Sequence, residues 1–266
     1  MNFATLKGLT IPEGVVTQIA DVNGNVLWML ETSKPIVLEV EKITSDTYAN
    51  STTYSNEQFV LINIYPKTAN STVSVTYGEL TKTLTFTSTS AQKVYFGTFN
   101  GVPDGVTTPA SGTLTINGEC AGVSIASYNV GKSSTDYCQC IIAVSDLGNV
   151  TFIPDYAFYS CTRITNITIP ESVTSIGALA FGRCRQIKSF TIPSAVTYIG
   201  KDAFYDPDGG AKTYILKPTT PPTLYGAGVW YGPTYIQAII VPKGCGNTYK
   251  AAEYWSKFAD KIVEES

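Results

Sequence analysis

The chain has 266 residues, of which 44% are hydrophobic and 15% are charged, and its formal net charge is −3. This composition excludes a disordered polypeptide, and the weakly acidic balance argues against nucleic acid as a partner. The chain contains no histidine, which excludes Ser-His-Asp and Cys-His nucleophiles and histidine-containing zinc sites. Carboxylate-only chemistry stays open, because a glycosidase needs only two acidic side chains at a suitable spacing.

Residues 1–32 contain the pattern of a β-hairpin. Apolar and polar residues alternate on both sides of Asn23-Gly24, a dipeptide that tolerates the positive φ angles of a type I′ turn. Apolar side chains such as Ile19 and Trp28 are too few to stabilise this element alone. We therefore expect it to pack on the neighbouring domain or, alternatively, to serve in assembly onto another chain.

Neither a leader nor a membrane span is predicted. The first residues, "MNFATLKGLTIPEGV", lack a basic region followed by an apolar segment, so they do not resemble a signal peptide. No apolar stretch approaches the roughly 20 residues that a spanning helix needs.

Residues 33–112 are predicted to form an antiparallel β-sandwich of the immunoglobulin-like kind. Five short strand-like runs, separated by polar, Gly- or Asn-containing breaks, indicate this fold; they cover 34–44, 57–67, 71–80, 81–89 and 91–99. The expected core is Val37, Leu38, Val60, Ile62, Val73, Val75, Leu84 and Phe86. The Gly- and Pro-rich segment 101–112 is predicted to connect this domain to the next one.

A repeat follows, with a period of 23 residues. Val150, Val173 and Val196 are separated by this step. The same step joins three further columns, which are Ile153, Ile176 and Ile199; Ala157, Ala180 and Ala203; and Phe158, Phe181 and Phe204. Repeats of about 20–29 residues are typical of leucine-rich-repeat proteins, in which each copy supplies a short strand and a return segment. We therefore predict a short stack of copies, forming a solenoid.

Each copy is predicted to place a strand in a parallel sheet. In "ITNITIP", Ile167 and Ile169 alternate with Asn166 and Thr168, as a strand with one buried face requires. Pro170 then ends the strand. Because one copy cannot cover its own apolar surface, the array must stack and be capped at its ends.

The phrase "ITIPESVTSIGALAFGRC" resembles the BspA-type leucine-rich repeat, a family of bacterial and protozoan surface proteins. The resemblance covers residues 150–205 and, with degenerate ends, 113–263, so a repeat domain is expected over 113–266. The closing segment is similar to the C-terminal caps of the family, where a helix follows the last strand. The spacing of Ala251, Ala252, Trp255, Phe258 and Ile262 is helical, and predicts Trp255 and Phe258 as lids on the core.

The family resemblance implies a non-catalytic binding protein. Its members are implicated in adhesion to host proteins, extracellular matrix or other bacteria, so the expected partner is a protein or glycan on a host or bacterial surface. The implied location is extracellular or at the cell surface, if a leader was removed. The resemblance implies no cofactor and supplies no ligand-contacting residues.

A second resemblance concerns the N-terminus. The segment "LTIPEGVVTQIADVNGNVLW" is similar to the opening of proteins encoded near tail genes in prophages of gut Firmicutes. It implies a virion-associated protein, either a structural component of the tail or a receptor-binding protein, with assembly through residues 1–32. A carboxylate-dependent glycan hydrolase is a third hypothesis, which requires a cleft with two facing acids.

Two groups of residues are candidate contacts. The first comprises outward strand positions, Asn166, Thr168, Lys188, Ser189 and Thr191, whose alternative role is a solvated sheet face. The second is an aromatic cluster flanked by glycines, Tyr225, Trp230, Tyr231 and Tyr235. Exposed Tyr and Trp suit protein or glycan recognition; the alternative is packing over the end of the repeat stack.

The cysteines indicate structure rather than chemistry. Cys161 and Cys184 share a repeat column, where stacked strands would bring them close enough for a disulfide, but thiols in such a column usually act as small apolar residues. We expect them to be free. Cys138 and Cys140 flank one residue, and a metal would need two more ligands that the sequence does not show. No metal site is therefore predicted.

Overall fold

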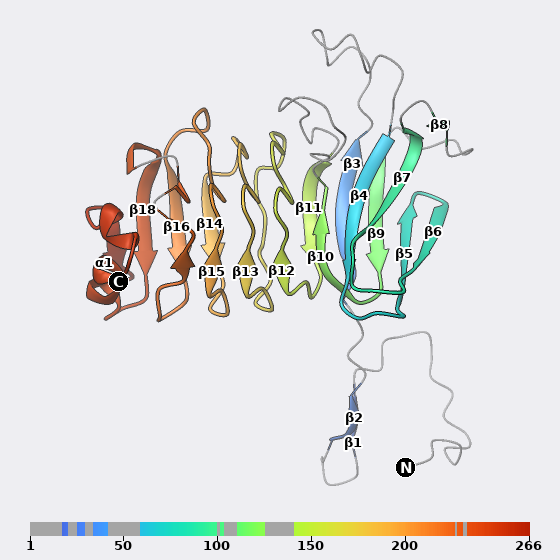
Figure 1. Ribbon diagram of the computed structural model, residues 1–266, viewed down its shortest axis with the longest axis horizontal. Helices are drawn as coiled ribbons and strands as arrows, with labels where there is room; N and C mark the ends of the chain where they lie inside the picture. The colour runs from blue at the N-terminus through green and yellow to red at the C-terminus, as the bar shows by residue number, and fades with distance from the viewer. Residues whose placement is uncertain are drawn as a thin grey trace.

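The computed structural model describes residues 18–20, 26–29, 34–41, 59–99, 102–103, 111–125, 141–226, 228–230 and 233–266. The many Thr, Ser, Val, Ile and Tyr residues of the chain favour strands over helices, and the described residues are mainly in strands, with few helices. Figure 1 shows antiparallel strands at one end of the molecule and a row of short parallel strands that runs from them toward a helical C-terminus.

Nine strands form two antiparallel sheets, ordered β10-β4-β7-β8 and β11-β3-β9-β5-β6. Their bounds are β3 (Ile36–Glu41), β4 (Phe59–Pro66), β5 (Thr72–Tyr77), β6 (Leu80–Thr85), β7 (Gln92–Phe99), β8 (Val102–Pro103), β9 (Ser111–Asn117), β10 (Cys120–Ser124) and β11 (Ile141–Leu147). The ring of Tyr77 on β5 lies 5.8 Å from the ring of Phe96 on β7, and both side chains are buried. The two sheets therefore contact each other through their apolar faces.

The five strands predicted between 34 and 99 are confirmed as β3 to β7. Of the expected core, Leu38, Ile62, Val73, Val75 and Phe86 are buried, whereas Val60 has a side chain outside the described part. Val37 was wrong: it is only partly buried, because β3 turns Ile36, Leu38 and Val40 inward. Leu84 packs against the core but is only partly buried, because β6 is the edge strand of its sheet.

The predicted domain boundary at 112 falls inside β9. β9 pairs with β3 and β5, β10 pairs with β4, and β11 pairs with β3. Residues up to Leu147 thus belong to the antiparallel sheets. The Gly- and Pro-rich composition of 101–112 marked a connection, but this connection lies between two strands of the sheets rather than after them.

The repeats form two parallel sheets, ordered β12-β13-β15-β17 and β14-β16-β18-β19. The first contains β12 (Phe152–Ile153), β13 (Ser175–Ile176), β15 (Tyr198–Ile199) and β17 (Thr223–Leu224); the second contains β14 (Ser189–Ile192), β16 (Lys212–Leu216), β18 (Ile236–Val241) and β19 (Ile262–Glu264). The predicted strand at 164–170 is not assigned as one, although Ile164, Ile167 and Ile169 are buried and the residues between them are exposed.

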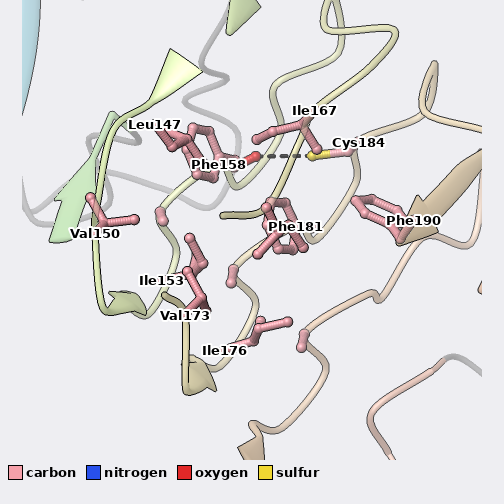
Figure 2. Close-up of a cluster of buried hydrophobic side chains, with 14 of the residues drawn as sticks. Leu147, Val150, Ile153, Phe158, Ile167, Val173, Ile176, Phe181, Cys184 and Phe190 are labelled. Atoms are coloured by element: carbon pink, nitrogen blue, oxygen red, sulfur yellow. Dashed lines mark hydrogen bonds between the residues drawn. The ribbon is translucent and has the colours of Figure 1, made fainter. Parts of the chain in front are cut away.

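The four predicted repeat columns are buried in every copy. Figure 2 shows Phe158 and Phe181 from successive copies among the aliphatic side chains of this core, with Phe190 nearby. The rings of Phe158, Phe181 and Phe204 stack at 5.5 and 5.6 Å. The period of 23 residues thus repeats one layer of the core.

Backbone hydrogen bonds join the antiparallel sheets to the first repeat. Thr174 donates to the carbonyl of Thr151, and Thr151 donates in the same way to Ala121 of β10, at 2.9 and 2.8 Å. The rings of Tyr65 on β4 and Phe152 on β12 lie 5.5 Å apart. β10 therefore occupies the place of a preceding repeat strand and covers the first copy.

The N-terminal hairpin is present as two paired strands, β1 (Gln18–Ala20) and β2 (Val26–Met29). Gln18 pairs with Met29 in antiparallel register. The predicted turn at Asn23-Gly24 lies outside the described residues.

The C-terminal end is closed by the helix α1 (Gly246–Ala251), a 3₁₀ turn η4 (Trp255–Phe258) and β19. Trp255 and Phe258 are buried, as expected of lids, and the indole of Trp255 donates to the carbonyl of Pro222 at 2.8 Å. The continuous helical spacing predicted from Ala251 to Ile262 was wrong, because Tyr254 adopts a left-handed conformation with φ of 64° that interrupts the helix.

Candidate functional site

The sheet β14-β16-β18-β19 presents one ordered row of side chains outward. Its parallel register aligns Thr191 with Ile215, Ile215 with Ile240, and Ile240 with Val263. Because side chains alternate across a strand, the neighbouring positions Phe190, Tyr214, Ile239 and Ile262 face the core, where all four are buried. The outward row therefore changes from hydroxyl-bearing to aliphatic toward the C-terminus. We call Thr191, Ile215, Ile240 and Val263 the outer row.

The aliphatic part of the outer row is accessible to solvent. Val263 is 48% exposed, and Ile215 and Ile240 are partly exposed. Sequence reasoning missed these three residues. They lie in the degenerate C-terminal end of the predicted repeat region, where no strand was predicted for Ile215. The alternation in "KTYIL" and "IQAIIV" was the pattern that could have found Ile215 and Ile240.

The five outward positions predicted from the sequence are all exposed. Asn166, Thr168, Ser189 and Thr191 lie on two successive copies. Lys188 differs, because its ammonium donates to the carbonyls of Arg185 and Gly209, each at 3.2 Å. Lys188 therefore also holds a loop of the next copy.

The second predicted group, the aromatic cluster, is not brought together on the surface. Tyr225 is 63% exposed and Tyr235 is partly buried; Tyr231 lies outside the described residues. The prediction of Trp230 as a contact residue was wrong, because its side chain is only 3% exposed and cannot contact a partner. Its ring lies 5.4 Å from Trp255 and 5.1 Å from Phe258, which is the alternative role of packing over the end of the stack.

Cys161 and Cys184 are both buried, and their thiols are not joined in a disulfide, as predicted. The Cys184 thiol donates to the carbonyl of Phe158 at 3.1 Å (Figure 2). Burial raises the pKa of Cys184 to about 12, so this sulfur stays protonated and is not a nucleophile at neutral pH. Cys138 and Cys140 lie outside the described part of the chain.

A crevice lies where the antiparallel sheets meet the first repeat. It is lined by Lys34, Lys67, Glu119, Cys120 and Asn149, among others. Glu119 is the carboxylate in its lining, and it forms an ion pair with Lys67 at 3.9 Å. This crevice does not offer the two facing acids that a glycosidase requires.

Within the described ranges, acidic side chains and cysteines nowhere gather in a group of three that would suit a metal ion. The same residues include no helix with the length and hydrophobicity needed to cross a bilayer.

Residues 128–245 match the family model described as "BspA type Leucine rich repeat region", in 6 copies. The match begins before the predicted 150–205 core of the repeats and extends beyond it. No curated protein matches the chain.

Proposed function

Because this chain carries a BspA-type leucine-rich-repeat region, we propose that it is a non-catalytic binding protein that acts in adhesion or recognition at a cell surface. It holds a protein partner against the outward face of the sheet β14-β16-β18-β19. The observation that carries this proposal is the outer row, in which Thr191, Ile215, Ile240 and Val263 follow one another in register.

The chemistry of the outer row favours a protein over a glycan. Exposed aliphatic side chains gain free energy when a partner covers them, at about 25 cal/mol per Å² of apolar surface removed from water. Thr191 and Thr213, which are at least partly exposed, supply hydroxyl groups beside this aliphatic strip. A glycan site usually relies on exposed aromatic rings, and the outer row contains none.

The strand pairings support a role for each of the two kinds of sheet. The two antiparallel sheets are proposed to be an immunoglobulin-like sandwich module, which serves as a spacer and covers the first repeat. The parallel sheets are proposed to be a short solenoid, whose flat and regular sides suit a large partner.

A binding screen tests the proposal. The full chain would be applied to a panel of extracellular-matrix proteins, whole bacterial cells and purified polysaccharides, and its retention measured. We expect retention on at least one protein and weakening by tenfold or more for the double variant Ile215→Lys, Ile240→Lys, since charged side chains resist burial.

The control is Thr197→Lys, which places one lysine on an exposed residue beside the other parallel sheet. It should bind like the wild type. Equal loss in both variants, or retention only on polysaccharides with no effect of the double variant, would overturn the assignment of the outer row. Absence of retention on the whole panel would count against adhesion itself.

A further inference from the structure

Lys212 and Asp206 form a charged pair inside the core of the repeats. Their side chains are 3% and 2% exposed, and Nζ lies 3.0 Å from Oδ2. The equivalent lysine one copy earlier, Lys188, is exposed. Of these two copies, only the one that contains Lys212 has a buried amine beside a buried carboxyl group.

The surroundings fix both groups. Nζ of Lys212 donates to the carbonyl of Cys184 at 2.8 Å and also to the carbonyl of Ile187. These two bonds use two of the three tetrahedral positions on the nitrogen, and Asp206 lies beside it. Neither carboxyl oxygen of Asp206 accepts a hydrogen bond of ordinary geometry. The carboxyl group is therefore poorly solvated by the protein, although it touches the amine.

The loop between the two residues encloses the carboxyl group. A Cβ atom added to Gly209 would lie 1.9 Å from Oδ2 of Asp206, so the backbone of Gly209 packs directly on it. The loop is also held from outside, because Arg185 pairs with Asp208 at 2.6 Å. The amine and the carboxyl group consequently have little freedom to separate.

Such a pair is costly as two ions. Removing both charges from water costs several kcal/mol per ion, and their attraction repays this only when further hydrogen bonds complete the site. Burial disfavours the charged forms, and it is the largest influence on Lys212, whose pKa is lowered. Transfer of one proton within the pair gives a neutral amine beside a neutral carboxylic acid.

We propose that Lys212 and Asp206 join in an intramolecular amide bond, which cross-links the loop 206–212. The lone pair of Nζ attacks Cγ of the carboxylic acid, and the C–O bond to one hydroxyl breaks. That hydroxyl leaves as water with a proton from the nitrogen, so the balance needs no oxidant or other reactant. The amide retains one N–H, which donates to the carbonyl of Cys184 or Ile187.

Position and environment both promote this reaction. Holding two reacting groups in contact replaces a bimolecular encounter with an intramolecular one, and a desolvated lysine is an effective nucleophile. Cys184 and Tyr214 interact electrostatically with the pair. Burial raises the pKa of both groups, so both stay neutral and place no second negative charge beside Asp206.

The bond would anchor β16 to the preceding return segment, directly beside the outer row. A covalent anchor at this place would resist unfolding when a bound partner pulls on the chain. It extends the binding proposal but does not depend on it, because the mass of the isolated protein reports the bond whether or not a partner is found.

Mass spectrometry of the full chain tests the proposal. The wild-type protein is expected to weigh less than its sequence by one water molecule. Trypsin should not cleave after Lys212, so a peptide covering 202–243 should appear with the same deficit, since Lys217 precedes a proline. The Lys212→Met and Asp206→Ala variants should each show the full sequence mass.

The matched control is Lys188→Met, which removes the exposed equivalent lysine and should keep the deficit. A wild-type chain of full sequence mass that yields a tryptic peptide ending at Lys212 would overturn the proposal and leave an ion pair in its place. This measurement on the wild type decides the question even if a core variant fails to fold.

Discussion

Gly200 lies where one copy of the repeat passes closest to the preceding one. A Cβ atom at this position would stand 2.6 Å from the backbone nitrogen of Ala178 and 2.7 Å from the carbonyl carbon of Gly177. Gly200 also donates from its own nitrogen to the carbonyl of Ile176 at 2.8 Å. The glycine after the Ile column is thus required for the close stacking of copies.

We expect Gly200→Ala to lower the free energy of unfolding by about 1–3 kcal/mol, the usual cost of overpacking against atoms that cannot move. Urea denaturation would measure it. Gly228→Ala is the matched control, because its added Cβ meets only the Asp202 side chain, at 3.2 Å. Equal stability of the two variants would contradict this account of the stacking.

Glu264 predicts a pH dependence of the C-terminal cap. Its carboxylate accepts hydrogen bonds from the backbone nitrogens of Gly244 and Gly246, at 2.9 and 2.8 Å, and these bonds hold its pKa below the ordinary value of 4.5. The stabilisation is complete above the ordinary pKa and is lost as the pH falls through the lowered one.

Glu264→Gln should therefore flatten the loss of stability in acid, measured as urea midpoints over a pH series. Glu253→Gln, which removes the same charge from an exposed residue, should leave the acid dependence unchanged. An unaltered slope in Glu264→Gln would argue against the two backbone hydrogen bonds as its cause.

Part of the candidate site could be predicted from the sequence, and single residues show why the rest could not. Thr168 and Thr191 were found because strand alternation holds within the regular copies. Ile215 was missed because it lies 24 residues after Thr191, whereas the regular step is 23. One inserted residue moves a side chain to the other face of a strand, so the sequence period alone could not place Ile215 outward.

At the scale of elements, the stacked phenylalanines hold the copies together. Phe181 is 1% exposed and its ring lies between those of Phe158 and Phe204. Figure 2 shows Phe158 and Phe181. We expect Phe181→Ala to cost about 3–5 kcal/mol of unfolding free energy, since it removes a large buried ring and leaves a cavity.

Tyr198→Ala is the control for this variant, because Tyr198 lies in the next copy but is 37% exposed. Its effect on the urea midpoint should be much smaller than that of Phe181→Ala. Comparable losses would mean that the column does not carry the stacking energy.

Strands were predicted well where apolar and polar residues alternate regularly. The C-terminal cap was predicted poorly, because its apolar spacing suits more than one kind of helix. The runs that became β5 and β6 alternate regularly, whereas the consecutive apolar residues at the start of β3 led to the wrong placement of Val37. At the C-terminus, Trp255 and Phe258 are three residues apart, which suits both an α-helix and the 3₁₀ turn that forms there. The left-handed conformation of Tyr254, which separates the two helical segments, has no sequence signature in a tyrosine.

At the scale of the whole molecule, the antiparallel sheets and the repeats share one backbone ladder. β10 stands where a preceding repeat would stand, with Thr151 donating to Ala121 and Ile125 donating to Ala157, at 2.8 and 2.9 Å. Figure 1 shows β10 beside β12, and the two strands are in contact. The repeats therefore depend on the antiparallel sheets as a cover.

We expect residues 148–266, expressed without the preceding sheets, to lose cooperative thermal unfolding, since the first copy would expose Val150, Ile153 and Phe158, which are buried in the whole chain. Circular dichroism of the fragment and of the full chain would measure this. A fragment with the same sharp transition as the full chain would show that the cover is dispensable.

The outer row is the surface on which the proposed partner binds. Hydroxyl-radical footprinting of the full chain, alone and with the panel protein that retains it, tests this most directly. We predict that oxidation of Ile215, Ile240 and Val263 falls in the complex, while oxidation of Tyr198 and Tyr225, both exposed, stays unchanged. Protection of the two tyrosines with an unprotected outer row would contradict it.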